Sequence, residues 1–444
     1  MATQIRISDH FNYSRLLRFT VPSIVMMVFT SLYSIVDGVF VSNFVGKTSF
    51  AAVNLIFPFL MVLGVVGFML GTGGSALVAK QMGEQKPEKA RQTFTLIVLA
   101  GAFSGVVLAA IGIPLLKSVA MMLGAGEDLA SLCAEYGRLV LSALPFFILQ
   151  NMFQSLFVAA ERPRMGLWVT VAAGLTNILL DYLLIAVFGL GLRGAAIATA
   201  ASEATGGIIP IVFFAMRNKS PLRFVRTHMD WRAIGQSCSN GLSEFFGNIS
   251  SSIVAMCYNY QLLRFFGEDG VSAYGVIMYV QFVFFAVFLG YTVGTSPIVS
   301  YNYGAKNHRE LHSILVKSIR LIGMAGIVLT ACIELSAGPL AALFVGYDTE
   351  LLSLTRRAFR IYGISYLLVG YNFYASAFFT ALNNGLISAT IATTRTLLFE
   401  TSAVFLIPAL LGHENIWFSV TFAETMSLAL SATLIVANRK RYNY

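Results

Sequence analysis

Charged residues are scarce in this sequence. Asp, Glu, Lys and Arg make up 11% of its 444 residues, whereas about 25% is usual for a soluble domain. Hydrophobic residues make up 57%, and they form continuous runs of roughly 20 residues instead of an alternating pattern. These features argue against a water-soluble fold and a β-barrel, and the length predicts an all-α polytopic membrane protein with about twelve transmembrane helices.

Catalytic and cysteine motifs are also absent. The four cysteines form no Cys-x-x-Cys pair, which disfavours a disulfide framework and a metal site. The sequence has no His-Glu-x-x-His helix, no Gly-x-Ser-x-Gly elbow and no phosphate-binding loop. We therefore expect no enzyme activity, no cofactor and no ATP hydrolysis. An intramembrane enzyme remains an alternative that no catalytic constellation supports.

The predicted spans fall into two sets of six. A basic cytoplasmic linker at 217–232 separates an N-terminal lobe, 1–216, from a C-terminal lobe, 233–444. The expected spans are 16–43, 51–79, 93–115, 133–160, 166–188, 194–216, 235–264, 271–300, 313–336, 353–382, 386–411 and 415–437.

The distribution of basic residues predicts the orientation of the chain. Of the 30 Lys and Arg residues, 21 lie in connections on the same side as the N-terminus. Positively charged loops stay in the cytoplasm, so both termini are predicted to be cytoplasmic in a multi-pass protein of the cell membrane. This topology also explains the net charge of +9 without a nucleic-acid partner. The expected partners are the lipid bilayer and small organic molecules, and we expect a monomer.

The two sets of spans share a repeated pattern. Small residues of one set recur in the other at a nearly constant offset along the chain. The clearest matches are Gly73, Ser75 and Gly83 with Gly294, Ser296 and Gly304. Because each set has an even number of spans, both sets have the same orientation in the membrane. We therefore expect two six-helix lobes related by a pseudo-two-fold axis along the membrane normal, with a cavity between them.

Two acids and an amide lie inside apolar runs of the first lobe. Asn177 and Asp181 are four residues apart and so share one helix face. A carboxylate at the middle of a span costs about 2.5–3.5 kcal/mol on insertion scales, so it must face protein or water. Asp37, in a polar patch with Tyr33, has a similar predicted depth. We predict that the two acids share a cation or a proton, or else form a structural hydrogen-bonded pair.

The other ionisable residues within the spans suggest less specific roles. Glu203 and Glu424 are related by the same offset as the small residues, so each lobe has a glutamate in its sixth span, suited to packing, a hinge or transport. Arg395 is expected to pair with Glu424 or Glu244 inside the second lobe. Glu244 is also a candidate gate or substrate counter-ion. Methionine and aromatic candidates for a cavity that binds flat cations are Met256, Tyr258 and Met278.

Several segments together resemble the multidrug and toxic compound extrusion (MATE) family over nearly the whole chain. The matching segments include Val36-Asp37-Gly38, Asn177-Ile-Leu-Leu-Asp181-Tyr, Gly194-Ala-Ala-Ile-Ala-Thr199 and Pro297-x-x-Ser300-x-Asn302-x-Gly304-Ala305. The resemblance implies two six-helix lobes in a V around a central cleft. It also implies antiport, in which Na⁺ or H⁺ enters as a drug-like, often cationic, compound leaves.

The resemblance further implies a coupling site in the first lobe. Residues that match the family's cation ligands are Asp37, Asn177, Asp181 and Thr199, with the carbonyl of Ala195 as a further ligand. Residues that match the surrounding polar network, the bend of the first helix and the acid of the last helix are Tyr136 and Asn151, Pro22, and Glu424. The same oxygen atoms serve Na⁺ and H⁺, so the sequence leaves the coupling ion open.

One departure from the family pattern indicates which branch of the family the chain resembles. Segment 361–382 lacks the acid that another branch uses as a cation ligand, so the chain resembles the DinF-like branch. The runner-up function is a flippase for lipid-linked oligosaccharide precursors, from the same superfamily. Such proteins carry several basic residues in the cavity to hold a pyrophosphate, whereas Arg395 is the only deeply placed basic residue here. Multidrug efflux by antiport is therefore the main hypothesis.

Overall fold

The described chain, residues 5–444 of a computed structural model, is built from helices; the side chains at positions 39, 42, 43 and 47 lie outside the description. The first lobe contains α1 (Tyr13–Phe40), η1 (Val41–Val45), α2 (Lys47–Gly83), α3 (Pro87–Met122), α4 (Glu127–Ser142), α5 (Leu144–Ala159), α6 (Pro163–Asp181), η2 (Tyr182–Val187) and α7 (Gly191–Ala215). After the short α8 (Trp231–Asn240), the second lobe contains α9 (Leu242–Gly304), α10 (His308–Val345), α11 (Thr349–Gly363), α12 (Tyr366–Ala381), α13 (Gly385–Thr393), η3 (Thr394–Glu400), α14 (Thr401–Leu411), η4 (His413–Phe418) and α15 (Ser419–Tyr442).

The helices form the twelve spans that the sequence predicted. Nine helices of the described chain are each long and apolar enough to cross a bilayer, and α4 with α5 forms a bent tenth span. One of the nine, α9, holds two spans, because it turns back at Gly267, where φ is 62° and ψ is −148°. The twelfth span is α11 with α12, whose first part carries one glutamate and three arginines. All backbone groups of such spans must be bonded internally, which is why the apolar runs are helical.

Three expected spans are interrupted. The span at 133–160 bends by 55° between α4 and α5, because Pro145 at the start of α5 has no N–H to donate to the preceding turn. The span expected at 235–264 begins as the separate α8, which ends at Gly241. The span at 353–382 breaks at Ser365, whereas the span at 133–160 breaks at Ala143. The repeat offset relates these two positions, so the second break repeats the first.

Turn geometry also repeats between the lobes. Gln85 (φ 61°) and Lys306 (φ 55°) occupy equivalent positions of the repeat, and so do Glu161 (φ 59°) and Asn383 (φ 57°). Positive φ is uncommon for residues other than glycine, so these coincidences indicate equivalent turns. The two lobes are structural repeats, which confirms the predicted two-lobe fold.

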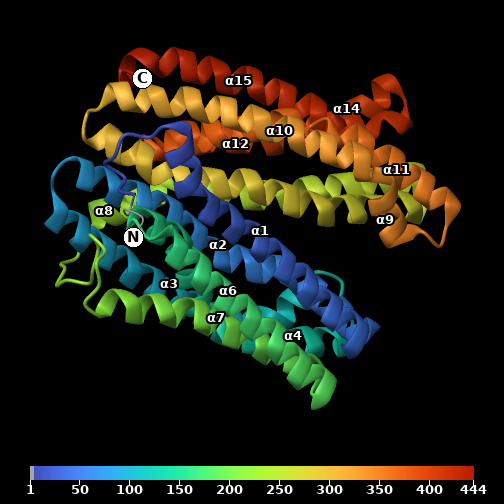
Figure 1. Cartoon of the computed structure of the whole chain (residues 1–444). Coiled ribbons are helices and arrows are strands. Elements are labelled where there is room, and N and C mark those ends of the chain that lie inside the picture. The colour runs from blue at the N-terminus through green and yellow to red at the C-terminus, as the bar shows by residue number, and fades with distance from the viewer. Residues whose placement is uncertain (1–4) are drawn as a thin grey trace.

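The lobes meet at the end of the molecule that carries both termini, here called the terminal face, and diverge toward the other end (Figure 1). Glycines let the two backbones approach closely there. A Cβ added to Gly83 would lie 2.0 Å from the carbonyl oxygen of Tyr301, and one added to Gly304 would lie 2.1 Å from that of Lys80. The repeat offset relates Gly83 to Gly304 and Lys80 to Tyr301, so it exchanges the two contacts. The pseudo-two-fold axis therefore passes close to this contact between the lobes, here called the seam.

The chain before α1 links the two lobes at the terminal face. The N–H of Ile7 donates to Glu161 Oε1 in the first lobe at 3.0 Å, and the N–H of Phe11 donates to Glu310 Oε1 in the second at 2.8 Å. His10 Nδ1 lies 2.6 Å from Glu310 Oε2. The side chains of Ile7 and Phe11 are buried in the core of the second lobe. This segment therefore helps to hold the terminal face closed.

Enlarging a glycine of α9 where it contacts α1 should destabilise the protein. An added Cβ at Gly290 would lie 2.4 Å from the Cα of Ile24 in α1. Gly290→Val should therefore lower the free energy of unfolding by about 1–3 kcal/mol, the usual cost of overpacking, measured as thermal unfolding in detergent. Gly275→Val is the matched control, because no described atom outside its own stretch of helix lies within 4 Å of its added Cβ. Equal losses in the two variants would contradict the proposed seam.

Candidate functional site

A cluster of polar side chains lies inside the first lobe, in the half away from the terminal face. Asp37 lies near the end of α1, and Asn177 and Asp181 lie near the end of α6. Thr199 and Glu203 lie in the first half of α7, which runs in the opposite direction. These helix directions bring all five residues, here called the first-lobe cluster, to similar depth.

The residues of the cluster face one another. The carboxyl group of Asp37 lies near both Asp181 and Asn177. Tyr136 of α4 lies near the hydroxyl of Thr199 and near both aspartates. The structure thus brings together the two acids, the amide and the hydroxyl that the sequence singled out. The hydroxyl of Thr199 also donates to the carbonyl of its α7 neighbour Ala195 at 3.0 Å.

Tyr33 and Gln150 connect Glu203 with the rest of the cluster. The hydroxyl of Tyr33 lies near Gln150 of α5 and near both Glu203 and Asp37. Gly206 leaves room for this amide, because an added Cβ would lie 2.5 Å from the Cδ of Gln150. Glu203 therefore belongs to the first-lobe cluster and not to the space between the lobes.

Several oxygen atoms of the cluster are buried without a partner. Asp181 is 0% exposed and Asn177 is 2% exposed. In the described chain, no hydrogen-bond partner is found for either carboxylate oxygen of Asp181, for Oδ1 of Asp37 or Asn177, or for Oε2 of Glu203. Nearly all buried polar atoms in proteins are bonded, and an unpaired buried carboxylate is costly. The geometry therefore leaves acceptor atoms available for a proton or a cation.

The chemistry of these atoms suits a hard monovalent cation or a proton. Carboxylate, amide and hydroxyl oxygens are the ligands that hard cations prefer. Across residues 5–444, apart from the undescribed side chains, no three His, Cys, Asp or Glu side chains are close enough to hold a metal ion. The donor set of Asp37, Asn177, Asp181 and Thr199 thus fits Na⁺ or H⁺ better than a transition metal.

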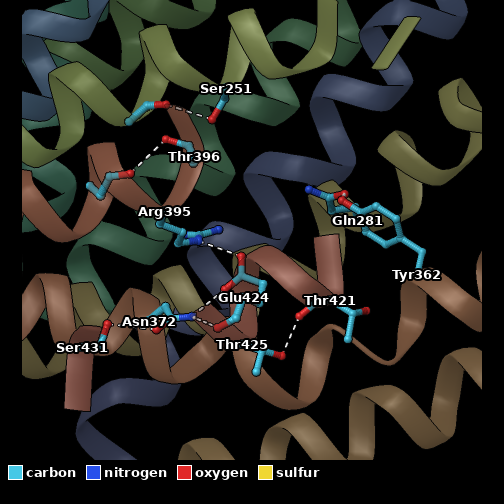
Figure 2. Close-up of polar contacts among 12 residues, drawn as sticks. Ser251, Gln281, Tyr362, Asn372, Arg395, Thr396, Thr421, Glu424, Thr425 and Ser431 are labelled. Carbon is cyan, nitrogen blue, oxygen red and sulfur yellow. Dashed lines mark hydrogen bonds and ion pairs between the residues drawn. The ribbon is translucent and has the colours of Figure 1, made fainter. Parts of the chain in front are cut away.

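A buried ion pair, Arg395 with Glu424, lies inside the second lobe (Figure 2). Arg395, in the π-helical η3, donates from Nε to Glu424 Oε1 at 2.7 Å, and its guanidinium lies 4.2 Å from the ring centre of Phe373. On the other side of Glu424, Asn372 Nδ2 donates to Oε2 at 2.7 Å and is itself held by Ser431 through its Oδ1 at 2.9 Å. Of the two partners predicted for Arg395, the structure shows Glu424 and not Glu244.

A cavity of about 230 Å³ lies between the lobes. Its charged lining residue within the described chain is Glu244, near the start of α9, and Asn151 and Asn248 also line it. The cavity is bounded by a contact between the lobes, in which the hydroxyl of Ser31 donates to the carbonyl of Phe282 at 3.2 Å. Asn151 therefore faces the cavity, while its neighbour Gln150 faces the first-lobe cluster.

The remaining sequence candidates lie elsewhere. Tyr258 is buried in the second-lobe core, stacked on Tyr274 with ring centres 4.8 Å apart. Met278 packs against the same core, and Met256 is 63% exposed. Pro22 lies inside the continuous helix α1.

Two amides of the polar centres were not singled out from the sequence. Gln150 contacts the first-lobe cluster, and Asn372 holds Glu424. Both residues are uncharged, so the cost of burying a charge, which distinguishes the acids within the spans, does not single them out. The signal they do carry is an amide side chain within an apolar helix.

Comparison with known proteins identifies the family. The MatE family model matches residues 22–183 and again 245–405. Each match covers most of one lobe, and the two begin about as far apart as the internal repeat. Together they cover well over half of the chain.

Individual relatives match along nearly the whole chain. The multidrug export protein MepA of Staphylococcus haemolyticus (strain JCSC1435) is 22% identical over 431 residues, which are 97% of this chain and 94% of the relative. A MATE crystal structure in complex with MaL6 has a TM-score of 0.93 at 21% identity, over 99% of this chain and 100% of that one. A multidrug resistance MATE transporter of the MOP superfamily, in an outward-facing conformation, has a TM-score of 0.92 at 21% identity, over 99% of both chains. The chain belongs to the MatE family of membrane transporters.

Proposed function

We propose that this protein exports drug-like organic compounds across the cell membrane in exchange for Na⁺ or H⁺. Family membership and the similarity to multidrug export proteins support the transport of such compounds. The observation that carries the coupling is the buried, unpaired carboxylate of Asp181 beside Asp37. Neither acid takes part in an ion pair of the described chain, in contrast to Glu424.

The proposed orientation places the terminal face in the cytoplasm. The closed seam at that face then corresponds to an outward-facing state, in which Na⁺ or H⁺ reaches the first-lobe cluster from outside. A bound cation satisfies the acceptor atoms of Asp37 and Asp181, draws α1 and α6 together and thereby changes the packing of α1 at the cavity. If this lowers the affinity for substrate, reciprocity requires that substrate lowers the affinity for the cation to the same extent.

The cavity between the lobes is the proposed substrate site. Glu244 supplies a negative charge, and Phe68 and Phe282 supply aromatic surface, a combination that suits an organic cation. The two lobes, 1–216 and 233–444, would move against each other about the linker 217–232 to expose this cavity on alternate sides. The protein would act as a monomer, because each chain has both lobes.

The cavity argues against a flippase for lipid-linked precursors. A pyrophosphate needs basic groups, whereas the charged lining residue of the described cavity is the acid Glu244. Arg395 is held by Glu424 in the second lobe, so it is not available to a bound phosphate.

Neutralising the first-lobe cluster should uncouple transport. Asp181→Asn keeps the size of the side chain but removes the charge, so we expect gradient-driven efflux from membrane vesicles to fall to background. Asp37→Asn should have the same effect. Asp269→Asn removes an exposed acid at the turn within α9 and should leave efflux unchanged. Normal efflux by folded Asp181→Asn protein would contradict the coupling role.

Breaking the second-lobe ion pair should affect stability. Removing one partner of a buried pair leaves an uncompensated charge and costs about 3–5 kcal/mol, so Arg395→Met should lower the thermal unfolding midpoint strongly. The double variant Arg395→Met with Glu424→Met should be more stable than the single variant. Arg357→Met, which breaks an exposed pair with Glu414, is the control and should cost less than about 1 kcal/mol. A double variant as unstable as the single variant would argue against a structural lock.

The acid of the cavity should distinguish substrates by charge. Glu244→Gln should weaken binding of a lipophilic monovalent cation about tenfold, which corresponds to about 1.4 kcal/mol, and leave a neutral analogue unchanged. Fluorescence titration of purified protein in detergent would measure both affinities. Ser296→Ala changes an uncharged lining residue and serves as the control. Equal weakening for both compounds would rule out a counter-ion role.

A further inference from the structure

A second cavity, on the terminal face between α1 and α6, is strongly basic. It has a volume of about 510 Å³. The basic side chains that line it are Arg18, Arg162, Arg164 and Lys219. None of the four takes part in an ion pair of the described chain. We propose that this cavity, here called the α1/α6 pocket, binds the phosphate headgroup of an anionic membrane phospholipid.

The charges of the pocket match a phosphate. Arg162 has a buried Nε that finds no hydrogen-bond partner in the described chain, and guanidinium groups bind phosphate oxygens with parallel hydrogen bonds. Glu161 also lines the pocket, but it accepts the N–H of Ile7, and burial raises the pKa of its carboxyl group. The positive charge therefore exceeds the negative charge at this site, whatever the state of Glu161.

The other lining residues favour a lipid over a soluble anion. Phe19, Pro22, Met165 and Phe213 give the pocket an apolar wall next to its basic groups. Trp168 lies five residues into α6, about 7.5 Å along the helix from its start, and is 66% exposed. Exposed tryptophans at that depth mark the boundary between headgroups and acyl chains. Basic pockets between membrane helices on the cytoplasmic side bind phospholipid headgroups in this way.

The place of the pocket links lipid binding to α1. Arg18 and Pro22 are one turn apart on α1 and both line the pocket, and the same helix carries Asp37 further along. A bound headgroup would hold the first turns of α1 against the start of α6. The inference concerns a lipid site outside the proposed transport pathway, so it stands or falls independently of ion coupling.

Native mass spectrometry of the purified chain would test the site. Protein saturated with equimolar phosphatidylglycerol and phosphatidylcholine should retain the anionic lipid preferentially. The triple variant Arg18→Gln, Arg162→Gln, Arg164→Gln should lose this preference, by about fivefold for each basic residue removed. The matched control, Arg217→Gln, Arg223→Gln, Arg226→Gln, removes three basic residues of the linker on the same face and should keep the preference.

Further experiments distinguish a phospholipid headgroup from soluble phosphate as the ligand. Millimolar inorganic phosphate should not displace phosphatidylglycerol; displacement would show a soluble-anion site and overturn the lipid assignment. Equal preference in the pocket variant and the wild type, or equal loss in the linker control, would overturn the site itself. If the triple variant does not fold, the single variant Arg164→Glu, at an exposed position, must still reduce retention of phosphatidylglycerol.

Discussion

An ionised carboxylate inside a membrane must find a partner, and the two lobes of this protein meet that constraint differently. In the second lobe, Glu424 is paired with Arg395 and further bonded by Asn372. In the first lobe, Asp37 and Asp181 face each other, and neither is paired with a basic side chain of the described chain. The second-lobe arrangement is complete by itself, whereas the first-lobe arrangement leaves acceptor atoms that are free to take up a proton or a cation. This difference is the basis of the proposed coupling.

The contrast between the lobes is informative because the helices around these buried acids follow the same pattern in both lobes. The breaks at Ala143 and Ser365, the turns with positive φ and the glycine contacts at the seam all recur at the repeat offset. Both lobes also carry a glutamate at the equivalent position, Glu203 and Glu424. What differs is the chemistry that surrounds the glutamates. Two lobes built from the same helices can move against each other. Polar residues that differ between the lobes can make this movement depend on an ion site in one lobe alone.

Much of this arrangement could be predicted from the sequence, because burial in lipid leaves few choices. Span number, the repeat, the depth of Asp37 and Asp181 and the pairing of Arg395 follow from apolar runs, offsets and the cost of buried charge. None of the three breaks within the spans was predicted from the sequence. The break at Ala143 has Pro145 beside it as a signal, whereas no proline lies near the break at Ser365. Gln150 and Asn151 show a further limit: adjacent on α5, they face different polar sites. Which neighbour faces which site depends on helix rotation, which tertiary packing sets.

The central claim is that export is driven by the exchange of a cation and by no other source of energy. The most direct test measures efflux of a fluorescent organic cation from energised vesicles that contain this protein, while the Na⁺ and pH gradients are collapsed separately and then together. The account predicts that collapsing one of the two gradients stops efflux and that restoring the same gradient restarts it without ATP. Efflux that continues with both gradients collapsed would contradict it.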